Sequence, residues 1–98
     1  MRLNQLEQQI IKDTIHEIMG NNAIVWLFGS RVDDNQYGGD IDLLIETDLD
    51  DPMEKIQKKS LLWAKLQQKL GEQRIDIILT TKEPQPIEKI AKTTGVRL

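Results

Sequence analysis

Three features of the sequence predict an α/β (α+β) fold, in which one small mixed β-sheet is flanked by helices. Apolar residues recur with helical spacing in some segments and form short continuous runs in others, in the order helix, strand, loop, strand, helix, strand, helix, strand. The longest helical segment separates the second and third strands, and a crossover of this kind lays its helix against the sheet. A chain of 98 residues, 39% hydrophobic and 30% charged, has the size and composition of one folded domain, which we expect to cover residues 1–98.

The first two elements are a helix and a buried strand. Asn4 and Glu7 have the spacing of a capping box, which predicts the start of a helix. The apolar residues that follow at helical spacing are Leu6, Ile10, Ile11, Ile15, Ile18 and Met19. Gly20 favours the left-handed conformation that ends helices, and the continuous apolar run at 23–28 then predicts a buried strand.

A loop, a second strand and the longest helix come next. Residues 29–39 are polar and rich in glycine, which predicts a turn or a short helix with a loop, and residues 40–46 predict a strand. Asp51 ahead of Pro52 places a helix N-cap before a first-turn proline. The helical spacing continues to Gly71 through Met53, Ile56, Trp63, Leu66 and Leu70.

The last third of the chain supplies two more strands and a short helix. Residues 74–80 are rich in β-branched side chains and are bounded by turn signals, so they predict the third strand. Two prolines mark a loop, after which residues 87–91 have the apolar spacing of a short helix. Residues 95–98 predict an edge strand at the chain end.

The composition excludes several classes of site. There is no cysteine and His16 is the only histidine, so any metal site must be built from oxygen ligands. The longest apolar runs are too short to cross a bilayer, and the N-terminus lacks the apolar core of a signal peptide. We therefore expect no membrane association and a cytoplasmic location.

Charge is distributed unevenly along the chain. Residues 33–54 carry nine acidic side chains and no lysine or arginine, whereas residues 55–98 carry ten basic and four acidic ones. A nucleic-acid binder usually presents a dominant basic face, so direct nucleic-acid binding is not expected. Phosphate can approach the acidic segment only if a cation bridges the two.

Three aspartates predict a metal site. Side chains two apart in a strand point to the same face, so Asp40 and Asp42 project together, and paired carboxylates favour Mg²⁺ or Mn²⁺. Asp76 is an isolated acid in an apolar strand and completes the site if its strand lies beside that of Asp40. The alternatives are that Asp40 and Asp42 are solvated strand residues, and that Asp76 pairs with Arg74 or a lysine.

A phosphate-binding turn is predicted at Gly29, Ser30 and Arg31. The glycine lets the backbone approach a phosphate, the exposed amides and the serine hydroxyl can donate hydrogen bonds, and the arginine adds a charge-assisted contact. A surface salt bridge is the alternative role for Arg31. Tyr37 stands in the loop ahead of Asp40, as a plain loop aromatic or a platform for a base.

The combined pattern resembles the DNA polymerase β-like nucleotidyltransferase superfamily, and most of all its minimal nucleotidyltransferases. The motifs that carry the resemblance are Leu27-Phe28-Gly29-Ser30-Arg31, Asp40-Ile41-Asp42-Leu43 and Ile75-Asp76-Ile77, with nine residues, 31–39, between Ser30 and Asp40. The sequence departs from the family pattern at Val32-Asp33-Asp34-Asn35, where basic residues and a glycine are common, and at Gly39, where serine is common.

The resemblance implies a nucleotidyltransferase fold and transfer of a nucleoside monophosphate, AMP from ATP above all, with Mg²⁺ as cofactor. Asp40 and Asp42 would bind both metal ions, Asp76 would complete the shell of the catalytic ion, and Gly29 with Ser30 would hold the triphosphate. Such proteins often work with a separately encoded helical protein of the HEPN or substrate-binding type. Some of these pairs are toxin and antitoxin, in which the minimal protein can transfer AMP onto its partner.

Two functions therefore compete. The first is an enzyme that transfers a nucleoside monophosphate to an acceptor. The second is a non-catalytic nucleotide-binding subunit or antitoxin that acts by direct contact. A domain of this size offers little surface for an acceptor, so either function predicts a partner chain or a homodimer. Trp26 and Trp63 are interpreted as core residues, and Lys55, Lys58 and Lys59 as a solvated helix face.

Overall fold

The computed structural model describes residues 3–29 and 41–98, and its elements follow the predicted order. They are α1 (Gln5–Met19), β1 (Ile24–Phe28), β2 (Ile41–Glu46), α2 (Pro52–Leu70), β3 (Ile75–Leu79), α3 (Pro86–Thr94) and β4 (Val96–Arg97). The four strands form one sheet in the order β3-β2-β1-β4. β1 runs antiparallel to β2 and β4, whereas β2 and β3 are parallel, so the sheet is mixed as predicted.

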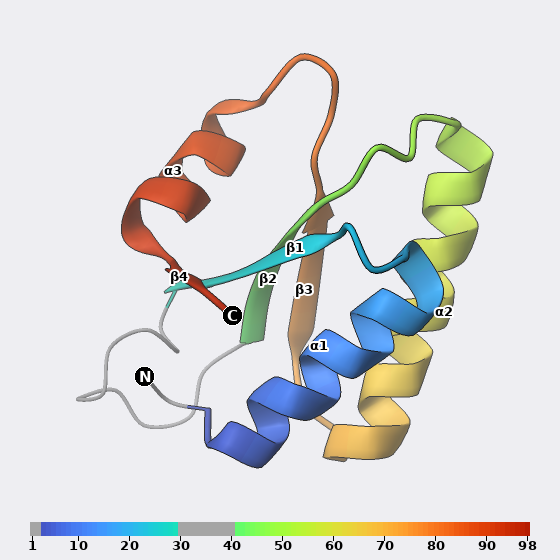
Figure 1. The fold of residues 1–98 in the computed structure, drawn as a ribbon, viewed down its shortest axis with the longest axis vertical. Coiled ribbons are helices and arrows are strands. Elements are labelled where there is room, and N and C mark those ends of the chain that lie inside the picture. The colour runs from blue at the N-terminus through green and yellow to red at the C-terminus, as the bar shows by residue number, and fades with distance from the viewer. Residues whose placement is uncertain (1–2, 30–40) are drawn as a thin grey trace.

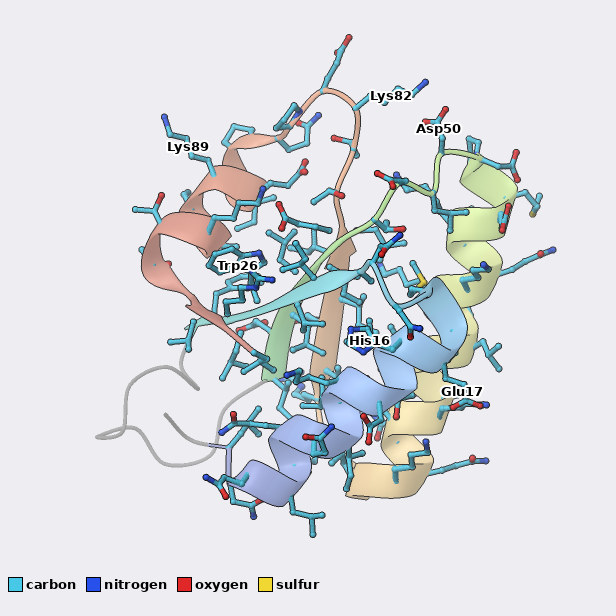
Figure 2. The ribbon with its side chains drawn as sticks, viewed as in Figure 1. His16, Glu17, Trp26, Asp50, Lys82 and Lys89 are labelled. Carbon is cyan, nitrogen blue, oxygen red and sulfur yellow. The ribbon has the colours of Figure 1, made fainter. Side chains whose placement is uncertain are left out.

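The helices lie on opposite sides of this sheet. α1 and α2 pack side by side and cover one face, and α3 packs against β1 and β2 on the other (Figure 1). The main core fills the space beneath α1 and α2, and its fully buried members include Ile11, Ile15, Leu27, Ile41, Leu43, Ile45, Leu62 and Leu66. Glu17 of α1 accepts a hydrogen bond from Lys65 of α2 at 2.8 Å, which joins the two helices at their surface (Figure 2).

The predicted helix starts are confirmed. The side chain of Asn4 accepts a hydrogen bond from the backbone N–H of Glu7 at 2.7 Å, and the carboxylate of Glu7 accepts one from the N–H of Asn4 at 3.1 Å. Asp51 caps α2 by accepting from the N–H of Glu54 at 2.9 Å, with Pro52 as the first helical residue. Each cap pairs a donor that would otherwise lack a partner at a helix start.

The prediction that Trp63 belongs to the core is wrong. α2 buries Leu62 and Leu66 against the sheet, and this rotation leaves Trp63 48% exposed. Met53 and Ile56 are exposed on the same side of the helix as Trp63. α2 therefore carries two apolar stripes, one facing the core and one facing outward beside β3.

None of the helices within residues 3–29 and 41–98 is both long enough and apolar enough to span a membrane.

Candidate active site

Asp42 and Asp76 stand directly opposite each other on neighbouring strands. Their Cα atoms are register partners in the parallel pairing of β2 with β3, and adjacent strands lie about 4.8 Å apart. Their neighbours Leu43 and Ile77 are buried in the core under α1 and α2, so the two aspartates project from the opposite face of the sheet. The parallel pairing thus brings together two of the three carboxylates that the sequence singled out.

Gly29 lies against the carboxylate of Asp42. Phe28 is the register partner of Asp42 in the antiparallel pairing of β1 with β2, and Gly29 follows it with φ +77°. A β-carbon built on Gly29 would overlap Oδ2 of Asp42. Only glycine permits both this backbone conformation and this approach, so the chain at the end of β1 runs close beside the acid.

Three of the predicted site residues fall outside the described part of the chain. Ser30 and Arg31 follow Gly29 in the sequence, and Asp40 precedes Ile41. Their roles as phosphate and metal ligands stay predictions, as does the face that Asp40 shares with Asp42 and the role of Tyr37.

Asp76 is exposed and forms no ion pair with the residues that the structure describes. Within residues 3–29 and 41–98 it has no salt-bridge partner, and Arg74 does not pair with it. The alternative explanation of this acid, a charge pair with Arg74 or a lysine, is therefore not what the described structure contains.

An open cleft of about 780 Å³ adjoins the two carboxylates. Asp42, Asp76 and Phe28 line it on the sheet side, and Ile56 and Trp63 line it on the α2 side. Neither α2 residue was predicted to line the site, because one apolar stripe was expected on this helix. The spacing of Leu62 and Leu66 also fits a core-facing stripe, but the sequence alone does not say which stripe faces the sheet.

A family model described as "Polymerase beta, Nucleotidyltransferase" matches residues 7–98. The chain belongs to this nucleotidyltransferase family. No curated protein matches its sequence. Family membership gives nucleotidyl transfer as the general function and transferase as the class of enzyme, and the small mixed sheet with its flanking helices agrees with the fold that the resemblance implied.

The described carboxylates of this nucleotidyltransferase domain fit part of a divalent-cation site. Carboxylate oxygens are the ligands that Mg²⁺ and Mn²⁺ prefer, and the absence of a side chain at Gly29 leaves room for the Asp42 carboxylate. The third predicted ligand, Asp40, lies beyond the described ranges, within which no group of three or more acids or histidines gathers to hold an ion.

A second cavity of about 990 Å³ lies at the opposite ends of the strands. Glu46 at its wall accepts a hydrogen bond from the indole N–H of Trp26 at 3.2 Å and pairs with Lys92 of α3. Figure 2 shows Trp26 on the α3 side of the sheet. Burial alone would raise the pKa of Glu46, but the bonds from Lys92 and Trp26 hold it below its usual value. These contacts attach α3 to the sheet, and this larger cavity lies away from the aspartate pair.

Glu88 is the buried acid of α3. It is 3% exposed, and its carboxylate accepts hydrogen bonds from the backbone N–H groups of Gln85 and Thr81 and from the Thr81 hydroxyl. Burial alone would raise its pKa, but these bonds and the nearby charge of Lys55 outweigh it and lower the pKa from 4.5. Glu88 therefore fastens the loop before α3 and has a structural role.

Proposed function

We propose that this nucleotidyltransferase domain transfers AMP from ATP, or the monophosphate of another nucleoside triphosphate, to an acceptor on a partner chain. Asp40, Asp42 and Asp76 would hold Mg²⁺, with Mn²⁺ as a substitute. The observation that carries the proposal is the register pair of Asp42 and Asp76, which faces an open cleft beside the backbone of Gly29.

The two described aspartates differ in surroundings, and this suggests a division of roles. In the transfer, an acceptor oxygen forms a bond to the α-phosphorus while the bond from that phosphorus to the leaving pyrophosphate breaks. A bound divalent cation supplies charge neutralisation at the phosphate oxygens. Asp42 is half-buried beside Gly29, on the triphosphate side, whereas Asp76 is exposed on β3. We therefore assign Asp76 the role of accepting a hydrogen bond from an acceptor hydroxyl and orienting it.

Triphosphate binding is proposed for the turn that begins at Gly29. Its positive φ turns the chain sharply at the end of β1, and the missing side chain lets the backbone approach a ligand. Ser30 and Arg31, the next two residues, would add a hydroxyl donor and a positive charge. Charge-assisted contacts of this kind offset the acidity of the aspartates when phosphate enters.

A partner chain is proposed because the cleft is open and is lined by exposed apolar side chains of α2. The resemblance to minimal nucleotidyltransferases suggests a helical partner of the HEPN or substrate-binding type, with this chain as the antitoxin of a toxin–antitoxin pair. The outward stripe of α2 favours such an assembly, since it exposes Met53, Ile56 and Trp63 to solvent.

The same stripe supports a second candidate function. A chain that neutralises its partner by contact alone needs an apolar surface and keeps the nucleotide site as a sensor or a relic. The two candidates differ in one product, because only the transferase leaves a covalent nucleoside monophosphate on the partner.

In the deciding experiment, the protein is incubated with its co-purifying partner, labelled ATP and Mg²⁺. The intact mass of the partner is then measured. Transfer of AMP adds on the order of 330 Da to the partner. Asp76→Asn should abolish this adduct while nucleotide binding partly survives, since Asp42 and the Gly29 turn remain. Absence of any adduct with every nucleotide, together with unchanged partner neutralisation by Asp76→Asn, would establish the contact-only function.

A further inference from the structure

The free edge of the sheet lies between the outward stripe of α2 and the aspartate pair. β3 ends the strand order, so within the described part of the chain only β2 pairs with it. Ile41 donates its backbone N–H to the carbonyl of Arg74 at 2.9 Å, and Thr80 donates to the carbonyl of Ile45 at 3.0 Å. Because a parallel ladder uses alternate residues, the backbone groups of Ile75 and Ile77 point away from β2.

The cleft described above extends around this edge. Its lining includes Ile75 and Ile77 of β3, Ile56 and Trp63 of α2, and Asp76 on the carboxylate face. Space therefore exists next to the outward N–H and C=O groups, with apolar side chains on one side and carboxylates on the other. On the carboxylate side the wall is completed by Ile87, which is 41% exposed.

We propose that an extended segment of a partner polypeptide docks here as an added strand on β3. A strand is the occupant that pairs the outward backbone groups of Ile75 and Ile77, which a partner helix would leave unpaired. Its side chains would alternate between the two faces of the sheet. One set would contact Ile56 and Trp63, and the other set would stand beside Asp76.

If the protein is a transferase as proposed, this alternation also determines where the acceptor side chain lies. A residue of the added strand that points to the carboxylate face enters the cleft next to Asp76. Pairing of backbone groups would thus deliver an acceptor side chain to the aspartates, without requiring a second domain in this chain.

Lys59 indicates the charge of the docked segment. It lines the cleft together with Ile56 and Trp63, is exposed, and has no ion-pair partner within residues 3–29 and 41–98. An Asp or Glu in the docked segment would complement it. A second copy of the chain fits less well, because edge-to-edge pairing would bring together two α2 helices that each carry five lysines and one acid.

The test uses a phage-displayed library of random nine-residue peptides, selected on the immobilised protein without nucleotide. We expect binders with alternating apolar residues and at least one acid. A synthetic binder should slow amide hydrogen exchange at Ile75 and Ile77. Methylation of the peptide nitrogens that face β3 should abolish binding, whereas methylation of the alternate nitrogens should preserve it.

Two matched variants test whether the peptide binds in this cleft. Ile56 is 62% exposed and lines the cleft, whereas Leu61 is 50% exposed on the same helix and does not line it. Ile56→Glu should weaken peptide binding about tenfold or more, and Leu61→Glu should leave it unchanged. Lys59→Glu should reverse the charge preference of the selected peptides. Circular dichroism checks that the variants fold.

The proposal is overturned if no peptide binds, if both glutamate variants bind alike, or if the protected amides lie away from β3. Self-association that protects Ile75 and Ile77 would assign the edge to a second copy and likewise overturn it. Because the selection contains no nucleotide, failure of docking is separate from failure of transfer, which is measured by the adduct mass.

Discussion

The backbone of Gly29 approaches Oδ2 of Asp42 so closely that no β-carbon fits between them. Gly29→Ala should therefore combine two costs, the strain of φ +77° and displacement of the carboxylate. Gly71→Ala is the matched control, since Gly71 has φ +85° and open space where its β-carbon would lie. We expect Gly71→Ala to lower the free energy of unfolding by about 1–2 kcal/mol and Gly29→Ala to lower it by more. Denaturant unfolding measures both, and metal-dependent nucleotide binding should fall in Gly29→Ala alone.

Asp76→Asn should lower metal affinity without lowering the stability of the fold. The carboxylate is exposed and adjoins Asp42, so removing its charge relieves repulsion without opening a cavity. We expect the free energy of unfolding to stay within about 0.5 kcal/mol of wild type or to rise, while metal affinity falls. Glu72→Gln, at an exposed acid outside the cleft, is the control for surface charge. Unfolding of Asp76→Asn would show that the acid is structural.

Removal of the metal should abolish stabilisation by nucleotide. A ligand that binds only the folded protein raises the melting temperature. At a concentration one hundred times its dissociation constant, it adds about 2.7 kcal/mol to the free energy of unfolding. ATP with Mg²⁺ or Mn²⁺ should produce such a shift in a thermal melt, and ATP in excess chelator should produce little. Equal shifts under both conditions would contradict a site in which a cation bridges the aspartates and the triphosphate.

Glu88 should make stability depend on pH in the acid range. Its pKa is lowered in the folded protein, so it contributes stability above pH 4.5, and this contribution is lost as the pH falls through the folded-state pKa. Glu88→Gln should cost about 1–3 kcal/mol at neutral pH because its hydrogen bonds to Thr81 and Gln85 are weakened or lost. The difference from wild type should shrink below pH 4.5, which chemical unfolding at several pH values can measure. Glu83→Gln, at an exposed position, should show neither effect.

The element order was predictable from the sequence because periodicity reports secondary structure directly. The α2 interface was harder to predict, since the apolar spacing of this helix does not say which of two stripes faces the sheet. Burial of Leu62 and Leu66 decides that question through tertiary packing and turns Trp63 outward. The pairing of Asp42 with Asp76 could be predicted only on the condition that β2 and β3 are neighbouring strands in the matching register. Tertiary structure decides this condition.

The parallel joining of β2 and β3 has a consequence for how the protein is made. Asp42 and Asp76 are separated along the chain by the whole of α2, and their strands meet only after that crossover has closed. Contacts between distant parts of a chain carry a loop-closure cost that slows folding. A nascent chain in which β3 is still inside the ribosome cannot pair Asp42 with Asp76, so the complete proposed site can form only after the crossover closes.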